Sequence, residues 1–496
     1  MAAYQYSPFS QNGIRLTTLR PGAFHDTLCI ELQEVQFSLT EPPVYEALSY
    51  VWGSTEDRVP VQVSGPAGGR THMITQNLAT ALRHLRFEDR LRVLWIDALC
   101  IDQSNLAERS QQVLKMGDIY RMSQRVVAWL GPESEDSSLA LDTIARLAPS
   151  IEMSRNDPGP RPSATSGFKL NSETARTGWL VVSHAEMRSI FRLISRKWFE
   201  RLWICQEITL GGNASFLLCG QKEILWANFC AVMRYMYTFQ GSLIEDLYAQ
   251  PFDKRMSLLV KLAYLRPGVT LQYLRMNASM FKCGDPKDRV YAVLSLLHPQ
   301  DQAIGITPDY SLTQSQVYRN TALAWIGHHK SLEILTTCEN QVGVDLPSWA
   351  PDWAVAQAAE APLLCYPDVH HWCQRYYLPT DVDSELEALP ISCKLLTTVE
   401  RIAALGWLET NDLIYGLRRL FPQSVRDDSY RGKPTLLEAY YRTLCRNEIR
   451  ESFFPPSLWC ISEEECETVF TALLSGDYKE LSDPIRQVNG FLTRVS

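Results

Sequence analysis

The chain has 496 residues, a hydrophobic content of 46% and a formal net charge of −8. These values are typical of a globular protein with room for about three ordinary domains. The acidic balance argues against a surface that binds nucleic-acid phosphates, so no nucleic-acid partner is expected. No apolar run reaches the roughly 18 to 20 residues that cross a bilayer, so no membrane span is expected.

The cysteines and the N-terminus point to one compartment. The 13 cysteines are spread singly along the chain, which is typical of reduced, buried thiols. His370, His371 and Cys373 lack a second ligand pair, so no metal site is expected. The first residues resemble neither a signal peptide nor a transit peptide. We therefore expect a cytoplasmic protein.

The first predicted elements are strands followed by a helix. Residues 14–40 alternate apolar and polar side chains around the turn at Pro21 and Gly22, which predicts a pair of strands. Residues 45–52 and 59–64 read as further strands. Helical spacing then covers residues 75–85.

A strand, helix, strand unit follows. Val93 to Ile96 are apolar at successive positions, as expected of an interior strand in a parallel sheet. Asn105 and Glu108 have the spacing of a reciprocal capping box, which starts the next helix. Residues 125–130 form the following strand. This order predicts a parallel sheet with right-handed crossovers.

Polar side chains follow the strand Val93 to Ile96, where ligands of open parallel sheets bind. Asp97, Cys100, Asp102 and Gln103 occupy this position. The two carboxylates are candidates for general acid and base, for ligand binding, or for capping the next helix. Buried packing is the better interpretation of Cys100, because its neighbours are apolar.

The next helix carries Glu108, Arg109 and Gln112 beside its apolar stripe. Its N-terminus favours a nearby anionic group. The alternative is a solvated helix face with local ion pairs.

Helical patterning from residue 185 to 210 contains the dense segment WFERLWICQE. Helical spacing puts Trp203, Gln206 and Glu207 on one face. A carboxylate beside an indole is a candidate for a raised pKa. The alternative is that Glu207 pairs with a buried arginine, such as Arg201 or Arg109. No Walker loop, GxGxxG, GxSxG or HExxH motif is present.

Three segments closely resemble the signature blocks of the fungal heterokaryon-incompatibility (HET) domain. They are YEALSYVWG (Tyr45 to Gly53), the segment from Leu94 to Gly131, and RKWFERLWICQEITLG (Arg196 to Gly211). The family commonly has asparagine where this chain has Asp102. GDPKDRVYAVLSLL (284–297), PDYS (308–311) and LPSWAPDW (346–353) are similar to the portion that follows many HET domains.

The resemblance implies a fold and a domain division. HET domains have been likened to TIR domains, so we expect an α/β fold with a TIR/flavodoxin-like parallel sheet core and flanking helices. A mainly helical C-terminal region follows it. The expected regions are a β lead-in (1–44), a HET domain (45–245) with a mobile insertion at about 156–178, a mainly helical region (246–390) and a small mixed region (391–496).

The resemblance also implies a function, namely an effector of fungal non-self recognition and programmed cell death with a protein partner. Because some TIR domains cleave NAD through a glutamate, Glu207 or Glu46 becomes a catalytic candidate by analogy. The second hypothesis is therefore an enzyme that acts on a nucleotide or a small molecule; the sequence names no cofactor. The third is a scaffold in which Trp52, Trp95, Trp129 and Trp203 are core aromatics.

Twelve residues follow as site candidates. The catalytic ones are Glu207, Asp97 and Asp102, and the ligand-binding ones are Glu46, Trp52, Cys100, Gln103, Arg109, Gln112, Arg201, Trp203 and Gln206.

Overall fold

The computed structural model describes residues 3–9, 12–64, 69–153, 160–162, 182–238, 249–332, 334–335, 338, 346–355, 448–450 and 458–460. The chain divides into two compact units. The first consists of Met1–Ser154, Pro160–Ala361 and Trp372–Ile391, and the second of the remaining residues. The described part of the second unit is an antiparallel pair, β12 (Glu448–Arg450) and β13 (Leu458–Cys460).

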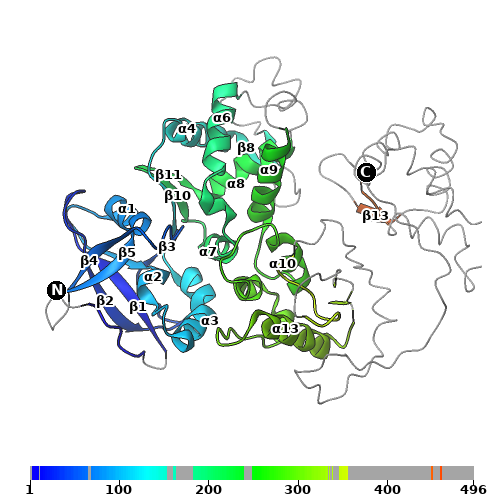
Figure 1. Cartoon of the computed structure of the whole chain (residues 1–496). Helices are drawn as coiled ribbons and strands as arrows, with labels where there is room; N and C mark the ends of the chain where they lie inside the picture. The colour runs from blue at the N-terminus through cyan, green and yellow to red at the C-terminus, as the bar shows by residue number, and fades with distance from the viewer. Residues whose placement is uncertain are drawn as a thin grey trace, which may run out of the picture. The chain divides into compact units, whose positions relative to one another are not determined.

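A nine-stranded sheet forms the centre of the first unit, with the order β11-β10-β7-β3-β6-β1-β2-β4-β5 (Figure 1). Its strands are β1 (Gly13–Leu19), β2 (Cys29–Gln36), β3 (Glu46–Tyr50), β4 (Arg58–Ser64), β5 (Arg70–Thr75), β6 (Arg92–Trp95), β7 (Val126–Gly131), β10 (Phe216–Cys219) and β11 (Lys222–Leu225).

The sheet is mixed, so the α/β class is confirmed but the expected parallel sheet is too simple. β3 runs parallel to both of its neighbours, β6 and β7, and β10 runs parallel to β7. β1 pairs antiparallel with β2 and with β6, and β10 pairs antiparallel with β11. Antiparallel pairs therefore extend this parallel part on both sides, and beyond β1 the sheet continues with the parallel pair β2 and β4 and the antiparallel pair β4 and β5.

The predicted strand, helix, strand unit is present as β6, α3 (Leu106–Met122) and β7, with the short α2 (Asp97–Cys100) after β6. The Asn105 side chain accepts a hydrogen bond from the Glu108 backbone N–H, so the predicted N-cap is confirmed. The reciprocal hydrogen bond of a capping box, from the Asn105 N–H to the Glu108 side chain, is not formed. The Glu108 carboxylate instead pairs with buried Arg15 of β1 at 2.6 Å and accepts from the Asp102 N–H.

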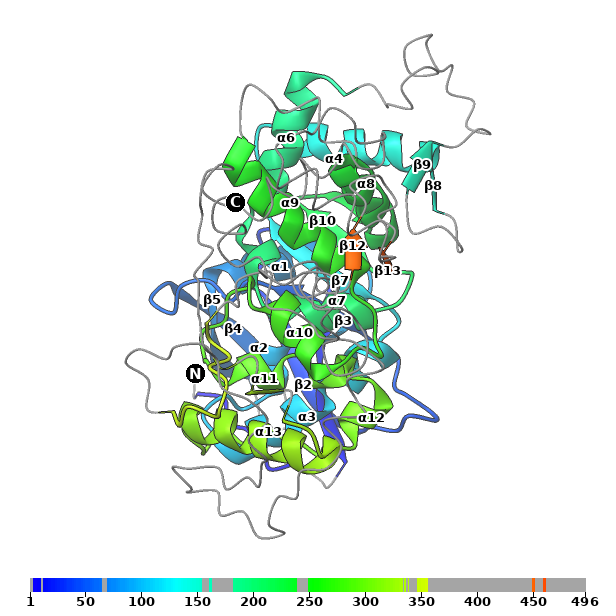
Figure 2. The same cartoon turned by 90° about the vertical axis from the view of Figure 1, so that its right-hand side faces the viewer.

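Hydrophobic clusters cover both faces of the sheet. Leu48, Leu94 and Val127 pack with α1 (Gln76–Leu85) on one face. Ala47, Trp95 and Ala128 pack on the other face with helices that include α3. Figure 2 shows the helices from α8 to α13 in front, with β2, β3 and β7 behind them.

The segment predicted as one helix from 185 to 210 is broken in the structure. It contains α6 (His184–Ile194), a 3-10 turn (Lys197–Glu200) and α7 (Ile204–Leu210).

Helices continue through the described part of residues 246–390. They are α9 (Ala249–Tyr264), α10 (Leu271–Ala278), α11 (Asp288–Tyr291), α12 (Pro299–Gln302) and α13 (Gln314–His329). Two further helices, α4 (Ser137–Leu147) and α8 (Trp226–Thr238), lie before this region. None of the described helices is both long and apolar enough to cross a membrane.

Several predictions from the sequence concern residues that lie outside the described part of the chain. The insertion at about 156–178 lies outside the described residues except for β9 (Pro160–Pro162), which pairs with β8 (Ile151–Met153). His370, His371 and Cys373 lie outside them too, as does the region 391–496 apart from β12 and β13.

Candidate functional site

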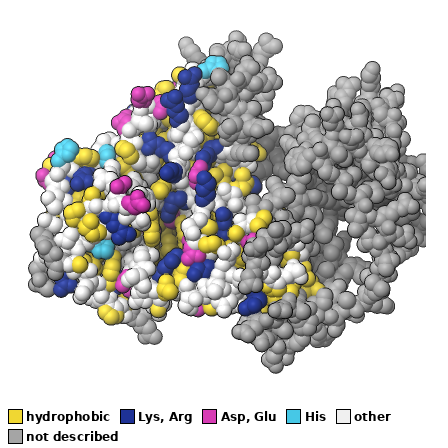
Figure 3. Space-filling view, viewed as in Figure 1, with side chains coloured by type: hydrophobic (Ala, Val, Ile, Leu, Met, Phe, Trp, Pro, Cys, Tyr) yellow, Lys and Arg dark blue, Asp and Glu magenta, His cyan; other side chains and the backbone are white. Residues whose placement is uncertain are grey.

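A cavity of about 440 Å³ lies just beyond the carboxyl ends of the parallel strands β3 and β6. This is the position that ligand sites occupy in open α/β sheets. Figure 3 shows this face of the chain hollowed between the sheet and the helices, with Lys and Arg side chains gathered along the hollow.

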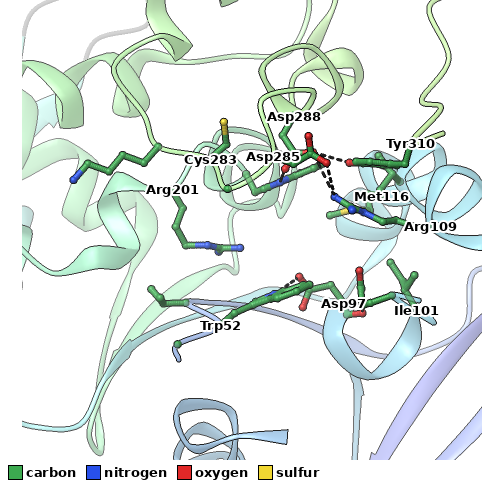
Figure 4. Close-up of a pocket in the computed structure, with 17 residues that line it drawn as sticks. Trp52, Asp97, Ile101, Arg109, Met116, Arg201, Cys283, Asp285, Asp288 and Tyr310 are labelled. Atoms are coloured by element: carbon green, nitrogen blue, oxygen red, sulfur yellow. Dashed lines mark hydrogen bonds and ion pairs between the residues drawn. The ribbon is translucent and has the colours of Figure 1, made fainter. Parts of the chain in front are cut away.

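Two parts of the chain line the cavity (Figure 4). Residues that precede position 204 form what we call the floor: Val51, Trp52, Gly53, Asp97, Ile101, Gln103, Arg109, Val113, Met116, Arg201 and Trp203. Residues that lie about 80 or more positions further on form the roof: Lys282, Cys283, Gly284, Asp285, Asp288 and Tyr310.

The centre of the floor is a pair formed by Trp52 and Asp97. The Trp52 Nε1–H donates to Asp97 Oδ2 at 2.8 Å, and the Ala98 N–H donates to Oδ1 at 2.7 Å. Gly53, which follows Trp52, has a φ of +82°, a conformation that favours glycine and lets the chain turn away beside the cavity. Asp97 is therefore held firmly by its neighbours.

Burial raises the pKa of Asp97 to about 6, and the nearby Glu207 charge acts in the same direction. The Arg201 guanidinium and the hydrogen bond from Trp52 oppose this shift without cancelling it. A carboxyl with such a pKa exchanges a proton near neutral pH, which suits general acid or base chemistry.

Arg201 extends into the cavity above Trp52 (Figure 4), and Glu207 holds it from behind. Its Nη1 lies 3.1 Å from Glu207 Oε2, and its Nη2 lies 3.4 Å from Oε1. Glu207 is 1% exposed and also accepts from the Ser49 hydroxyl, which in turn accepts from Trp198 Nε1 at 2.8 Å. Glu207 is thus a buried group that positions Arg201, the alternative that the sequence left open.

The roof is fastened to the floor through Asp288. Trp203 Nε1 donates to Asp288 Oδ2 at 3.0 Å, and the Tyr310 hydroxyl donates to Oδ1 at 2.7 Å. Arg109 reaches Asp285 at 3.6 Å and Asp288 at 3.9 Å, and its guanidinium lies 3.5 Å from the centre of the Tyr310 ring. Burial raises the pKa of Asp288, although its hydrogen bonds and Arg109 act against the shift.

The two parts also touch away from the cavity. A Cβ atom added to Gly117 of α3 would lie 2.2 Å from the Cβ of Ser295, so this glycine permits the close approach. The Ser295 hydroxyl donates to Gln206 Oε1 at 2.5 Å, and the Leu202 N–H donates to the Lys282 carbonyl at 2.8 Å. The floor and the roof therefore pack as parts of one unit.

Half of the sequence candidates line this cavity, namely Trp52, Asp97, Gln103, Arg109, Arg201 and Trp203. Glu207 lies directly behind them. The other five lie elsewhere: Glu46, Cys100, Asp102, Gln112 and Gln206.

These other candidates make mainly structural contacts. Glu46 pairs with Arg92 and Arg125. Gln112 donates to the Gly13 carbonyl at 3.2 Å. Cys100 is buried against Thr17, and burial raises the pKa of its thiol to about 11. Asp102 accepts from the N–H and the hydroxyl of Ser104, which closes a local turn, and it faces a second cavity of about 760 Å³.

The sequence candidates did not include the roof residues Lys282, Cys283, Asp285, Asp288 and Tyr310. A signal was present for Asp285, Asp288 and Tyr310, because they lie in GDPKDRVYAVLSLL and PDYS, which are similar to the portion that follows many HET domains. Among the residues that the structure describes, no group of three or more His, Cys, Asp or Glu side chains is arranged to hold a metal ion.

These features define an α/β protein with an aromatic and acidic cavity at the carboxyl ends of parallel strands. Residues 45–207, which supply the whole floor, match the family model described as heterokaryon incompatibility protein (HET). The chain therefore contains a HET-family domain over these residues.

The chain is also similar to heterokaryon incompatibility protein 6, OR allele, from Neurospora crassa. The two are 30% identical over 400 residues, which cover 68% of this chain and 57% of that relative. The chain thus spans less than two thirds of the length of the relative. No solved structure matches the chain.

Proposed function

We propose that this protein acts in the cytoplasm as an effector of fungal non-self recognition, and that its activity leads to programmed cell death when incompatible cells fuse. The observation that carries this proposal is the HET match over residues 45–207, supported by the similarity to the incompatibility protein of Neurospora crassa. A protein partner from the incompatible cell would be its trigger.

We further propose that the cavity is the working site of this effector. The family block is folded around it, because the loop after β3, the turn after β6 and the segment before α7 all converge there. A role limited to stabilising the fold does not require an open hollow with a buried carboxylate and two arginines in its walls.

Controlled expression in a filamentous fungus tests the proposal. We expect growth arrest and cell death on induction of the full chain, and no arrest with Asp97→Ala at the same level of soluble protein. Normal growth with the folded wild-type protein, both alone and after fusion with strains of different incompatibility type, would refute the effector role.

An enzymatic activity on a nucleotide is the second candidate, and one observation favours it. Asp97, with its pKa raised to about 6, lies at the cavity wall beside the indole of Trp52. It is better placed than Glu207 to act as general acid or base, because Glu207 is 1% exposed.

Incubation of the purified protein with NAD, followed by detection of nicotinamide, tests the hydrolase form of this candidate. Release that disappears in Asp97→Asn supports it. Absence of turnover at high protein concentration removes NAD hydrolysis.

A further inference from the structure

The cations of the cavity are already paired with carboxylates. Arg201 is paired with Glu207, and Arg109 lies near both Asp285 and Asp288. The Lys282 ammonium, at the roof, lies 2.9 Å from Glu200 Oε2. The walls therefore carry no excess of positive charge that would draw in a phosphate group.

The remaining surface of the cavity is apolar and aromatic. Ile101, Val113 and Met116 line it together with the indoles of Trp52 and Trp203. The Trp52 side chain is 39% exposed, a high value for a tryptophan whose N–H is already bonded inside the protein. Its ring is thus fixed in place and still has an accessible surface for a planar partner.

A small set of polar groups surrounds this surface. The Asp97 carboxylate accepts hydrogen bonds, and the Arg201 guanidinium, above Trp52, can donate them (Figure 4). The amide of Gln103, which donates to the Asp97 carbonyl at 3.0 Å, adds a further polar group. The cavity thus offers a hydrogen-bond acceptor and a hydrogen-bond donor beside a flat apolar surface. This arrangement matches a heteroaromatic ring whose edge carries N–H groups next to ring nitrogens or carbonyls.

We propose that the cavity binds the heteroaromatic base of a nucleoside, stacked on Trp52, with N–H groups of the base toward Asp97. The volume of about 440 Å³ is in the range of pockets for small molecules. The sugar and any phosphate then lie toward the open side, because a phosphate inside would have to compete with Glu207 for Arg201 and with Asp285 and Asp288 for Arg109. This inference rests on the proposal that the cavity is the working site, and it names the ligand class.

Calorimetric titration of the full chain tests this ligand class. The probes are adenosine, guanosine, cytidine and uridine, each with its 5′-monophosphate, and ribose 5-phosphate as the matched ligand without a base. We expect at least one nucleoside to bind, its monophosphate to differ by less than about threefold in Kd, and ribose 5-phosphate not to bind. Failure of all four nucleosides, or binding that requires the phosphate, would overturn the proposal.

Two matched substitutions locate the binding. Trp52→Leu should weaken it roughly tenfold or more, because stacking of a base on an aromatic ring contributes about 1–3 kcal/mol. Phe24→Leu is the control: Phe24 is 37% exposed but contacts His25 and His84, outside the cavity. Equal binding by both variants would show that the nucleoside binds outside the cavity.

The outcome is independent of the effector assay. If no nucleoside binds while Asp97→Ala still abolishes growth arrest, the cavity keeps its role and the ligand class is wrong. If a nucleoside binds and the wild-type protein causes no arrest, the ligand class holds and the effector role fails.

Discussion

Two clusters of buried charge lie near opposite ends of the short strand β3, and they differ in composition. At its first residue, Glu46 is bound by two arginines: Arg92 Nη2 lies 3.1 Å and Arg125 Nε 2.5 Å from Oε1. Beyond its other end, the single Arg201 is paired with Glu207 and also interacts electrostatically with Asp97.

This difference decides how each acid behaves. Burial alone would raise the pKa of Glu46, but Arg92 and Arg125 hold it below its ordinary value, so the acid stays ionised. Burial raises the pKa of Asp97 to about 6, because Arg201, which is paired with Glu207, lowers this pKa without cancelling the effect of burial. An acid with excess cations stabilises the fold, whereas an acid with too few is kept ready to exchange a proton.

Removal of the acid from each cluster should have the largest effect on stability. Glu46→Ala leaves the buried Arg92 without its carboxylate, so we expect the free energy of unfolding to fall by about 3–5 kcal/mol. Glu207→Ala should cost less, because Arg201 reaches the cavity and still has Asp97 nearby. Urea denaturation followed by circular dichroism measures this. A loss below about 1 kcal/mol in Glu46→Ala would show that Arg92 is solvated.

The contact between floor and roof is a second place to test the account. Gly117→Ala puts a Cβ atom 2.2 Å from that of Ser295, so we expect a loss of about 1–3 kcal/mol instead of the gain usual for glycine to alanine in a helix. The double variant Gly117→Ala/Ser295→Gly should recover most of it. If the double variant is no more stable than Gly117→Ala, Gly117 and Ser295 do not pack against each other.

The two clusters should respond to pH in opposite directions. Because the folded pKa of Asp97 is raised, its contribution to stability is highest below pH 4 and is lost as the pH rises toward 6. Because the pKa of Glu46 is lowered, its contribution is present above its ordinary pKa and is lost as the pH falls.

The free energy of unfolding is measured from pH 3 to 7 for the wild type, Asp97→Asn and Glu46→Gln. The difference between the wild type and each variant gives the contribution of that carboxyl group to stability at each pH. One proton changes the slope by at most about 1.4 kcal/mol per pH unit. Slopes of the same sign in both differences would contradict the contrast between the clusters.

The smallest effect on stability is expected at the cavity surface. Trp52→Leu removes a ring that is 39% exposed, so the free energy of unfolding should fall by about 1 kcal/mol or less. Growth arrest in the fungal host should nevertheless disappear. A thermal scan of the purified variant, set beside the growth assay, separates these two effects; retained arrest would exclude Trp52 from the site.

Local sequence patterns sufficed for much of the fold. Four successive apolar residues identified β6 as an interior strand, and Asn105 was correctly predicted to cap α3. The antiparallel placement of β1 beside β6 could not be predicted, because alternation of apolar and polar residues carries no information on strand direction.

Local sequence patterns also failed to predict two features of the site. Helical spacing grouped Trp203 with Glu207, and the Glu207 N–H does donate to the Trp203 carbonyl at the start of α7. The spacing could not show what surrounds each side chain: Trp203 lines the cavity, whereas Glu207 is buried behind Arg201. The roof residues, such as Asp288, lie about 80 positions beyond Glu207 in the sequence, and only tertiary packing brings them to the floor.

The most direct test of the central claim compares the two clusters in living cells. Asp97→Ala and Glu46→Gln are each expressed in the fungal host at the soluble level of the wild type, and growth arrest is scored on induction. We predict that Glu46→Gln still arrests growth and that Asp97→Ala does not. Growth arrest by Asp97→Ala equal to that of the wild type would contradict the assignment of the cavity as the working site.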